Sequence, residues 1–381
     1  MMNSPICEML DIEFPLLAFS HCRDVVAAVS KAGGMGVFGA VNLPPERLKA
    51  ELDWIDAHVD GKPYGVDLIV PNKFLGKGEK LDTGKLLESV PEEHKRFAGD
   101  LMAKYGIDAG DLENDRRMSV NFARNLRDEG AASSLKVAFQ YPIKLIANAL
   151  GVPPQIMLDM AREKGVATAA LVGAKEHAVA QVRAGVDILV VAGGEAGGHC
   201  GEVSTMVLVP EVFEAVREMG SNTPILAAGG ITTGGQMAAA MAMGAAGAWC
   251  GSVWLTTAEA ETNPVVKEKM LAASSRDTVR SRSRTGKPSR QLRSPWTDAW
   301  EAEGAPEPLP MPLQSLVSEP ALRKIDKLSQ SGHQGAKDLA TYWVGQGVGL
   351  MNQSMSAGQV VQQFKEDFIA AYERLAGSLD S

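Results

Sequence analysis

The chain has 381 residues, of which 45% are hydrophobic and 22% are charged, and its formal net charge at pH 7 is −8. This composition is that of a globular protein, and the acidic balance argues against nucleic acid as a partner. No apolar run reaches the roughly 18–20 residues of a membrane span, and the first residues lack the basic and apolar regions of a signal peptide, so we expect a cytoplasmic protein.

Short β-rich apolar runs alternate with helix-like segments through the first two thirds of the chain. Helices are predicted at 44–57, 153–164, 175–183, 210–219 and 236–243. Strand and helix in alternation, about 30 residues per unit, are typical of parallel sheets. Eight strands predict an α/β fold, a (β/α)8 TIM-type barrel, with an open doubly wound sheet as the alternative. The candidate strands are 12–18, 36–40, 65–70, 143–148, 166–171, 187–192, 224–228 and 247–251.

Two segments do not follow this repeat. Residues 71–140 are rich in charge, with helices predicted at 91–105 and 111–128, and form either a solvated helical insertion after strand three or a lid over the barrel mouth. Residues 263–381 contain basic and Pro-rich stretches and a helix predicted at 359–375. We therefore expect a barrel built from 1–70 and 141–262, with 263–381 as a C-terminal extension subdomain that packs on it.

Glycine-rich turns follow the last three predicted strands, in "VVAGGEAGGHCGE", "PILAAGGITTGG" and "GAWCGSVW". Active sites of barrel enzymes lie at the carboxyl ends of the strands, and the loops after strands seven and eight commonly bind phosphate. Gly229, Gly230, Gly251 and Ser252 occupy those loops. Glycine lets backbone N–H groups approach an anion, although these residues also suit turns that bind nothing.

One histidine has a position that favours chemistry. His199 lies between glycines beside the predicted phosphate site, whereas His21 follows strand one and is a weaker candidate. The remaining histidines, His58, His94, His177 and His333, are interpreted as structural. The cysteines are scattered without a C-x-x-C pair, so no metal site or disulfide framework is predicted, and only Cys200 adjoins the candidate histidine.

A basic run covers residues 280–293. Such a run is usually a solvated face or a set of ion pairs with acidic residues, and the alternative is a grip for a phosphorylated co-substrate. Its members are Arg280, Arg282, Arg284, Lys287, Arg290 and Arg293.

With these motifs the sequence resembles the nitronate monooxygenase (2-nitropropane dioxygenase) family, which includes the FMN-dependent enoyl-acyl-carrier-protein reductases. "GGEAGGHCG" is similar to the family's E-A-G-G-H-x-G signature, and the resemblance runs from "FPLLAFSHC" through "GSVWL" to "RTGKPSRQLR". It implies an FMN-binding barrel in which His199 acts as a base or an electrostatic partner. The cofactor-binding residues that it implies are Ala18, Phe19, Ser20, Asp67, Ala192, Gly197, Gly198, Gly229, Gly230, Trp249, Cys250, Gly251 and Ser252.

Asp67 departs from the family pattern, because it falls where an asparagine usually lies against the flavin. A carboxylate cannot donate a hydrogen bond as an amide does unless it is protonated, so we expect this departure to affect the flavin's potential. Phe19 and Ser20 likewise replace the family's usual Pro-Met pair.

Three functions compete at this point. The first is an FMN oxidase or monooxygenase that oxidises alkyl nitronates with O2, and the second is an NAD(P)H-dependent FMN reductase of an enoyl thioester or quinone. The third is a barrel that binds a phosphorylated metabolite without redox chemistry. All three imply a small-molecule partner and no membrane or nucleic acid, and the sequence predicts no oligomeric state.

Overall fold

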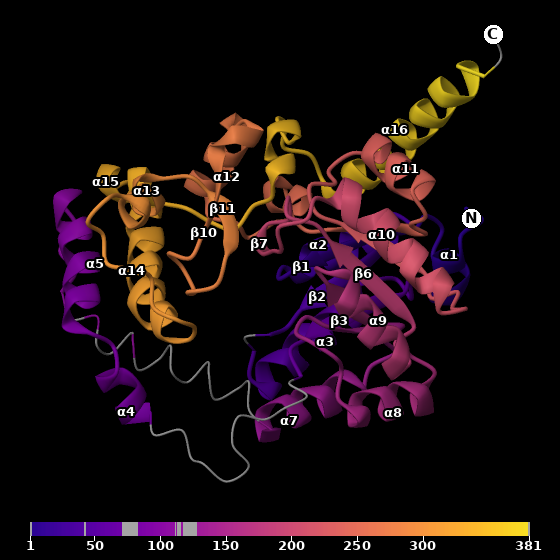
Figure 1. Cartoon of the computed structure of the whole chain (residues 1–381), viewed down its shortest axis with the longest axis horizontal. Coiled ribbons are helices and arrows are strands. Elements are labelled where there is room, and N and C mark those ends of the chain that lie inside the picture. Colours follow the sequence, from indigo (N-terminus) through magenta and orange to yellow (C-terminus); the bar gives the residue numbers. More distant parts are fainter. Residues whose placement is uncertain are drawn as a thin grey trace.

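The computed structural model describes residues 2–41, 43–70, 83–110, 112, 116 and 128–379. Eight parallel strands form a closed barrel in the order β1-β2-β3-β4-β5-β6-β8-β9, with β9 paired to β1 (Figure 1). The predicted (β/α)8 architecture is therefore confirmed. The barrel strands are β1 (Leu16–Ser20), β2 (Met35–Gly39), β3 (Tyr64–Leu68), β4 (Leu145–Asn148), β5 (Ala167–Val172), β6 (Ile188–Ala192), β8 (Ile225–Ala228) and β9 (Gly247–Cys250).

Helices between successive strands cover the outside of the barrel (Figure 1). Their apolar faces pack against the outward-facing strand residues, as in α2, where Val25, Val26 and Val29 are fully buried. A Cβ on Gly36 would lie 2.3 Å from the Val26 carbonyl oxygen, so glycine permits the close approach of this helix to β2. The covering helices are α2 (Arg23–Lys31), α3 (Pro45–His58), α7 (Asp128–Ala138), α8 (Gln155–Lys164), α9 (Lys175–Ala184), α10 (Thr205–Glu218) and α11 (Gly234–Ala242).

The barrel interior is filled by inward-facing side chains rather than open. Leu17, Leu145 and Ile188 are fully buried in one apolar cluster, which also contains Ile6 and Leu10 from the short helix α1 (Pro5–Leu10). Thus α1 closes the end of the barrel opposite to the carboxyl ends of the strands, and only the other end is available for a ligand.

Two predicted boundaries within the barrel differ from the structure by more than two residues. The first strand begins at Leu16 rather than at residue 12, because the preceding residues turn toward Gly33, whose carbonyl accepts the Phe14 N–H. Helix α10 begins at Thr205 and contains Pro210, where sequence analysis placed its start. The missing N–H of proline costs one helical hydrogen bond there, and that cost is tolerated in a helix whose apolar face is buried against the barrel.

Residues beyond the barrel form a second apolar core. Trp296 and Val317 are fully buried in it, and Ala98 and Met102 of α5 join them, so part of the 71–140 segment packs with the C-terminal extension. The predicted helix at 111–128 falls almost entirely outside the described residues. The additional elements are α4 (Thr83–Glu88), α5 (Glu92–Lys104), η1 (Ser252–Thr256), α12 (Pro264–Ala272), η2 (Ser275–Asp277), α13 (Pro295–Glu301), α14 (Leu313–Gln330), α15 (Gln334–Leu339), η3 (Gln346–Leu350) and α16 (Ala357–Gly377).

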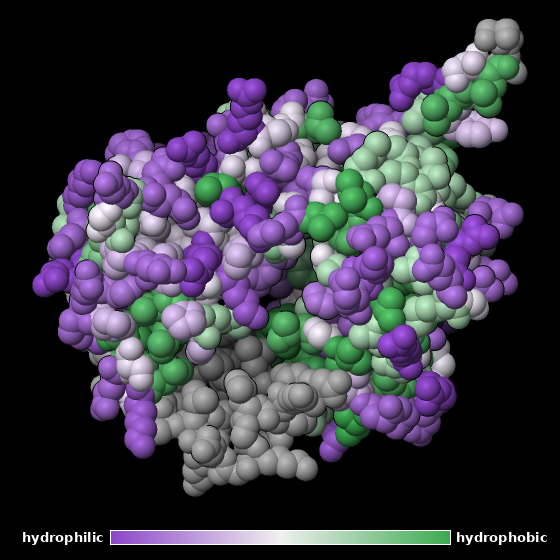
Figure 2. Space-filling view, viewed as in Figure 1, coloured by the Kyte–Doolittle hydropathy of each residue, from purple (hydrophilic) through white to green (hydrophobic). Residues whose placement is uncertain are grey.

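Helix α16 returns to the barrel and packs against α11 and α2 through its first half, where Val361 and Phe364 are buried. Its distal end projects from the body, and Ile369 and Leu375 give that end an exposed apolar surface (Figures 1 and 2). Throughout the described part of the chain, no helix combines the length and the apolar character needed to span a bilayer.

A second, three-stranded sheet connects the extension to the barrel mouth. The hairpin of β10 (Thr278–Ser281) and β11 (Ser289–Leu292) pairs through β11 with β7 (Gly198–His199), which lies in the loop after β6. His199 is the register partner of Ser289, and Gly198 is the partner of Arg290. The hairpin therefore fixes the segment that carries the candidate histidine.

Candidate active site

The predicted site residues lie at or just beyond the carboxyl ends of the barrel strands, but their side chains point in different directions. Phe19, Ala192 and Trp249 face the barrel interior, where the Phe19 and Trp249 rings are stacked with centroids 6.3 Å apart. The side chains of Ala18 and Cys250 instead pack in the outer core between strands and helices. Those two residues can therefore present only main-chain atoms to a ligand at the mouth.

The glycine turn after β8 forms a close-packed cradle with the loop after β6. Gly229 and Gly230 have φ values of +99° and +72°, which side chains of L-residues rarely adopt. A Cβ on Gly229 would lie 3.0 Å from the backbone nitrogen of Gly193, and one on Gly230 would lie 3.0 Å from the Cβ of Glu195. Only glycine fits these two positions, and it leaves the wall of the mouth to main-chain groups.

Two other glycines at the mouth have free space beside them. A Cβ on Gly251 would meet no atom closer than the Phe19 ring at 3.8 Å, and one on Gly198 would meet nothing within 4 Å. At these two positions the wall of the mouth consists of backbone without side chains. A flat or anionic cofactor can approach such a wall closely.

Sequence analysis missed a third segment of this cradle, residues 345–347. The Gly345 N–H donates to Ser252 Oγ over 2.9 Å, and the Gln346 N–H donates to the Glu195 carbonyl over 2.9 Å. A Cβ on Gly347 would lie 2.7 Å from the Gly230 carbonyl oxygen. The signal in the sequence was the alternation of glycines in "WVGQGVGL", a pattern that gives no indication of its distant partners.

Glu195 supports the cradle by capping α10. Its Oε2 accepts hydrogen bonds from the backbone N–H and the hydroxyl of Thr205, each 2.9 Å long. The same hydroxyl lies 3.1 Å from the Ala228 carbonyl and 3.0 Å from that of Gly229. Glu195 thus supports the turn after β8 indirectly, through Thr205, the first residue of α10.

His199 is exposed at the mouth, and its Nε2 lies 2.7 Å from Oγ1 of Thr285 in the hairpin turn. Partial desolvation by the surrounding protein lowers the pKa of His199, and the positive charges of Lys287 and Arg284 lower this pKa further. The imidazole is therefore neutral at neutral pH and able to accept a proton.

Arg284 orders the neighbourhood of His199 without contacting it through a hydrogen bond. Its guanidinium is buried, pairs with Glu319 over 2.8 Å and lies 4.1 Å above the ring of Trp343. The Trp343 ring is in turn 6.4 Å from the imidazole of His199, centroid to centroid. The aromatic wall beside His199 is thus fixed by a buried ion pair and a cation–π contact.

Asp67 is fully enclosed by the barrel. It follows the outward-facing Val66 on β3, so its side chain points inward, and its Oδ1 has no hydrogen-bond partner among the described residues. Burial raises the pKa of Asp67 well above its usual value. Burial therefore favours the neutral acid, whose hydrogen is available to a ligand.

Four of the other histidines bind main-chain groups. His21 lies at the mouth, where its Nδ1 is 2.7 Å from the Gly39 carbonyl, and His58 binds the Trp54 carbonyl within its own helix. His94 contacts the Glu307 carbonyl at 2.9 Å, and His333 caps α15. These contacts fit the structural interpretation of the last three, while His21 remains near the site without a catalytic contact.

The basic run is largely a set of ion pairs rather than a free cationic surface. Four of its arginines each have a carboxylate partner within 3.4 Å, and Arg290 donates two hydrogen bonds to the Gly194 carbonyl. The exposed Lys287 has no ion-pair partner in the part of the chain that the structure describes. The four pairs are Arg280–Glu202, Arg282–Glu307, Arg284–Glu319 and Arg293–Asp298.

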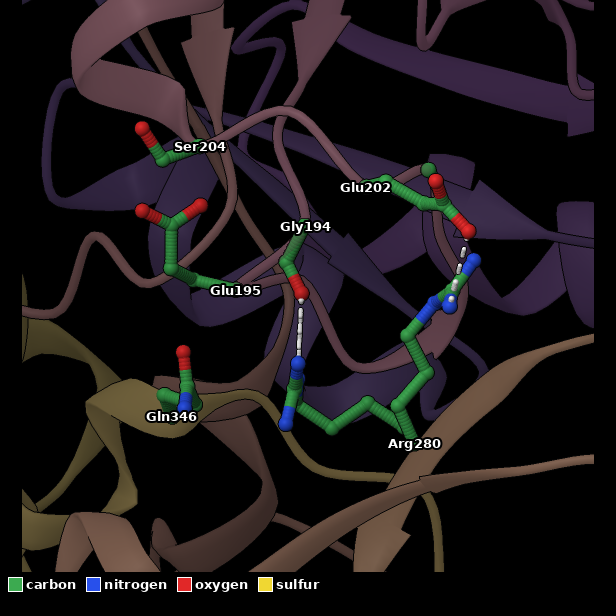
Figure 3. Close-up of a pocket in the computed structure, with 8 residues that line it drawn as sticks. Gly194, Glu195, Glu202, Ser204, Arg280 and Gln346 are labelled. Atoms are coloured by element: carbon green, nitrogen blue, oxygen red, sulfur yellow. Dashed lines mark hydrogen bonds and ion pairs between the residues drawn. The ribbon is translucent and has the colours of Figure 1, made fainter.

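A cavity of about 370 Å³ lies on the other face of the three-stranded sheet (Figure 3). Arg280 and Arg290 are register partners, so they share a face with Gly198, whereas His199 shares the opposite face with Ser289. The cavity is therefore distinct from the histidine side of the mouth. Its lining residues are Gly194, Glu195, Gly201, Glu202, Ser204, Arg280, Arg290 and Gln346.

Comparisons with known proteins agree with this geometry. The family model described as nitronate monooxygenase matches residues 3–367. A Mycobacterium tuberculosis protein whose name assigns it, without a substrate, to the monooxygenases is 52% identical over 378 residues, which cover 99% of each chain. A Staphylococcus saprophyticus protein named as a probable nitronate monooxygenase is 26% identical over 376 residues, which cover 95% of this chain and 96% of the relative.

Further relatives carry other names. A second M. tuberculosis protein, (3aS,4S,5R,7aS)-5-hydroxy-7a-methyl-1-oxo-octahydro-1H-indene-4-carboxyl-CoA dehydrogenase, is 26% identical over 79% of this chain and 69% of its own. The solved structure of FabK from Thermotoga maritima has a TM-score of 0.70 and 26% identity over 99% of this chain and 100% of its own. That of nitroalkane oxidase from Streptomyces ansochromogenes has a TM-score of 0.78 at 24% identity over 97% and 99%, a likeness of fold.

Proposed function

Since the chain belongs to the nitronate monooxygenase family, and is therefore an oxidoreductase, we propose that it binds FMN and oxidises alkyl nitronates with O2. The observation that carries this proposal is the position of His199 beside a mouth whose wall consists of glycine backbone, and the lowered pKa of His199 favours its neutral form. Relatives named as nitronate monooxygenases over nearly the whole chain support it.

The residues at the mouth fit FMN. The left-handed turn at Gly229 and Gly230 would hold the phosphate with Gly251 and Ser252, because the three glycines offer main-chain N–H groups that no Cβ covers. Asp67 offers a hydrogen from inside the barrel, where its Oδ1 has no protein partner. When bound, FMN supplies the acceptor for the two electrons of the oxidation.

The chain's own residues handle the proton and the charge. The neutral His199 accepts the proton from the carbon next to a nitro group, whose C–H bond pair then remains on the nitronate anion. Lys287 and Arg284, which lower the pKa of His199, favour the anion electrostatically. A substrate that enters as the nitronate has already lost this proton, and the same charges stabilise it.

We also propose the division of the chain expected from its sequence. Residues 1–70 and 141–262 form the FMN-binding barrel, 71–140 are an insertion, and 263–381 are an extension packed on the barrel. The pairing of β7 with the β10–β11 hairpin supports a functional link between barrel and extension.

A second candidate is an NAD(P)H-dependent FMN reductase that acts on an enoyl thioester or a quinone. The likeness to FabK and to a dehydrogenase of a coenzyme A thioester favours it. The arginines of the basic run already bind neighbouring acidic side chains and carbonyls, which argues against a phosphate-binding role for this run.

Anaerobic mixing separates the two candidates. The purified protein with FMN is mixed with an alkyl nitronate and, in parallel, with NADH and NADPH, while flavin absorbance is followed. The expected result is bleaching by the nitronate alone and, in a separate aerobic assay, O2 uptake that needs no nicotinamide. Bleaching by NAD(P)H alone would replace the first candidate with the second, and a protein that binds no flavin would refute both.

A further inference from the structure

Thr285 is joined to His199 by the shortest side-chain contact that the histidine makes. The two residues are 86 positions apart, yet Oγ1 of Thr285 lies 2.7 Å from Nε2 of His199. The Thr285 side chain is buried in the turn of the β10–β11 hairpin. Thr285 lies within "RTGKPSRQLR", the stretch that resembles the family, but the sequence predicted no role for this threonine.

The turn around Thr285 is held from several sides. Ser318 Oγ donates to the Arg284 carbonyl, and Gln314 Nε2 donates to the Ser283 carbonyl over 2.8 Å, both from α14. Gly286 has a φ of +84°, and a Cβ there would lie 2.0 Å from the Leu309 carbonyl oxygen, so the turn is pressed against residues 309–311. The hydroxyl of Thr285 is therefore presented from a fixed backbone.

The hydrogen bonds of this hydroxyl determine which nitrogen of His199 carries the hydrogen. Oγ1 of Thr285 has three partners: Nε2 of His199 at 2.7 Å, the Lys287 N–H at 3.3 Å and the Lys287 carbonyl at 3.3 Å. A hydroxyl has one hydrogen to donate and two lone pairs to accept with. The Lys287 N–H can only donate, and the Lys287 carbonyl can only accept.

One arrangement satisfies all three contacts. The Thr285 hydroxyl donates to the Lys287 carbonyl and accepts from both the Lys287 N–H and an N–H on Nε2 of His199. If Nε2 lacked its hydrogen, the single hydroxyl hydrogen would go to Nε2, and the contact with the Lys287 carbonyl would be lost. The three distances thus favour an imidazole protonated on Nε2.

We propose that Thr285 is a positioning residue that holds His199 in the Nε2–H tautomer and leaves Nδ1 as the nitrogen that accepts the substrate proton. Among the described residues, Nδ1 of His199 has no hydrogen-bond partner, so it is free to act. The tautomer follows from the contacts alone, and the role of Nδ1 rests on the proposed function of His199.

The charges around His199 bear on its titration. Arg284 and Lys287, both in the hairpin turn, are the charged groups that act on it, and the Trp343 ring that flanks it is uncharged. The imidazolium keeps its Nε2–H bonded to Thr285, so the hydroxyl stabilises the charged form. Removal of the hydroxyl therefore lowers the pKa of His199, in the same direction as the two cations.

Nitrogen NMR of FMN-loaded protein labelled with [15N]histidine tests the tautomer directly, because protonated and unprotonated imidazole nitrogens differ widely in chemical shift. The His199→Asn spectrum identifies the signals of His199. The expected result is a protonated Nε2 and an unprotonated Nδ1 above the pKa. The opposite assignment in the unsubstituted protein would overturn the proposal without reference to activity.

Two matched variants test the role. Thr285→Val keeps the shape and loses the hydroxyl, while Thr285→Ser keeps the hydroxyl. With a neutral nitroalkane as substrate, we expect Thr285→Val to lose the tautomer preference, to lower kcat about 10–100-fold and to move the acid limb of the pH–rate profile to lower pH. Thr285→Ser should retain the wild-type behaviour in all three respects. Thr285→Ala replaces the valine variant if valine disturbs the turn.

The outcomes separate this inference from the function on which it rests. Unchanged kcat and pH profile in a folded Thr285→Val variant would overturn the positioning role. Wild-type turnover of a neutral nitroalkane in His199→Asn would overturn the proposed role of His199 as the base and the role of Nδ1 with it. The spectrum would still decide whether Thr285 sets the tautomer.

Discussion

Replacement of Asp67 by asparagine is expected to stabilise the protein increasingly as the pH rises. Asp67 is enclosed in the barrel without a partner for Oδ1, and burial raises its pKa well above the usual value. The folded protein therefore holds a proton on Asp67 that the unfolded chain releases above about pH 4. The contribution of Asp67 to the free energy of unfolding is therefore fully present below that pH, and it is lost as the pH rises toward the pKa of Asp67 in the folded protein.

The size of the effect follows from the number of protons. One proton more in the folded than in the unfolded state makes the free energy of unfolding fall by about 1.4 kcal/mol per pH unit. The amide of the Asp67→Asn variant does not titrate, so the difference between variant and wild type grows at that rate until Asp67 ionises in the folded state. For a chain of this length it corresponds to about 2 °C in Tm per pH unit.

Urea unfolding at pH 5, 6 and 7, with and without added FMN, measures this difference. Asp53→Asn is the control, because Asp53 is exposed and its pKa is lowered by Lys49 and Tyr141, so its removal should not stabilise the protein as the pH rises. A stability difference between wild type and Asp67→Asn that is independent of pH would refute the reasoning, since Asp67 would then be ionised or solvated in the folded protein.

Three further predictions concern the mouth and its support. His199→Asn should keep FMN and the fold while turnover of a neutral nitroalkane falls about 10²–10⁴-fold, and wild-type turnover with FMN bound would contradict the assignment of the base. Gly230→Ala should weaken FMN binding in a fluorescence titration, because its φ of +72° and the Glu195 side chain exclude a Cβ, whereas Gly220→Ala, with φ +69° and free space, controls for backbone strain alone. Glu319→Gln should destabilise the protein by about 2–4 kcal/mol in urea unfolding, since it leaves the buried Arg284 without its charge partner, and a loss below about 1 kcal/mol would mean that the pair is solvated.

The sequence was sufficient for the barrel because its evidence is local. Each strand is a short apolar run that ends in a small residue, and the turns at Gly193 and Gly229 mark where β6 and β8 stop. The same locality explains the errors at element ends. Helix α10 starts five residues before Pro210, because Ser204 and the carboxylate of Glu195 provide its beginning and the barrel surface holds its apolar face.

The surroundings of His199 could not be predicted, because they come from residues far away in the sequence. Strand β7 has two residues, which carry no periodicity of their own, and its pairing partner β11 lies about ninety positions later. The basic run looked like one surface, yet Arg280 and Arg290 share one face of the hairpin, the other arginines lie outside its strands, and each arginine has a partner of its own. Thr285 and residues 345–347 could not be predicted because they lie far in sequence from the residues that they contact.

The small sheet has a consequence for how this barrel is specialised. It separates His199 and Ser289 on one face from Arg280 and Arg290 on the other, and the turn of its hairpin carries Thr285. The glycine turns after β6 and β8 belong to the barrel, but the groups that set the tautomer, the pKa and the aromatic wall of the histidine all belong to the extension. Substitutions in the extension can therefore retune the proton chemistry of His199 while the glycine turns that would hold the cofactor stay unchanged.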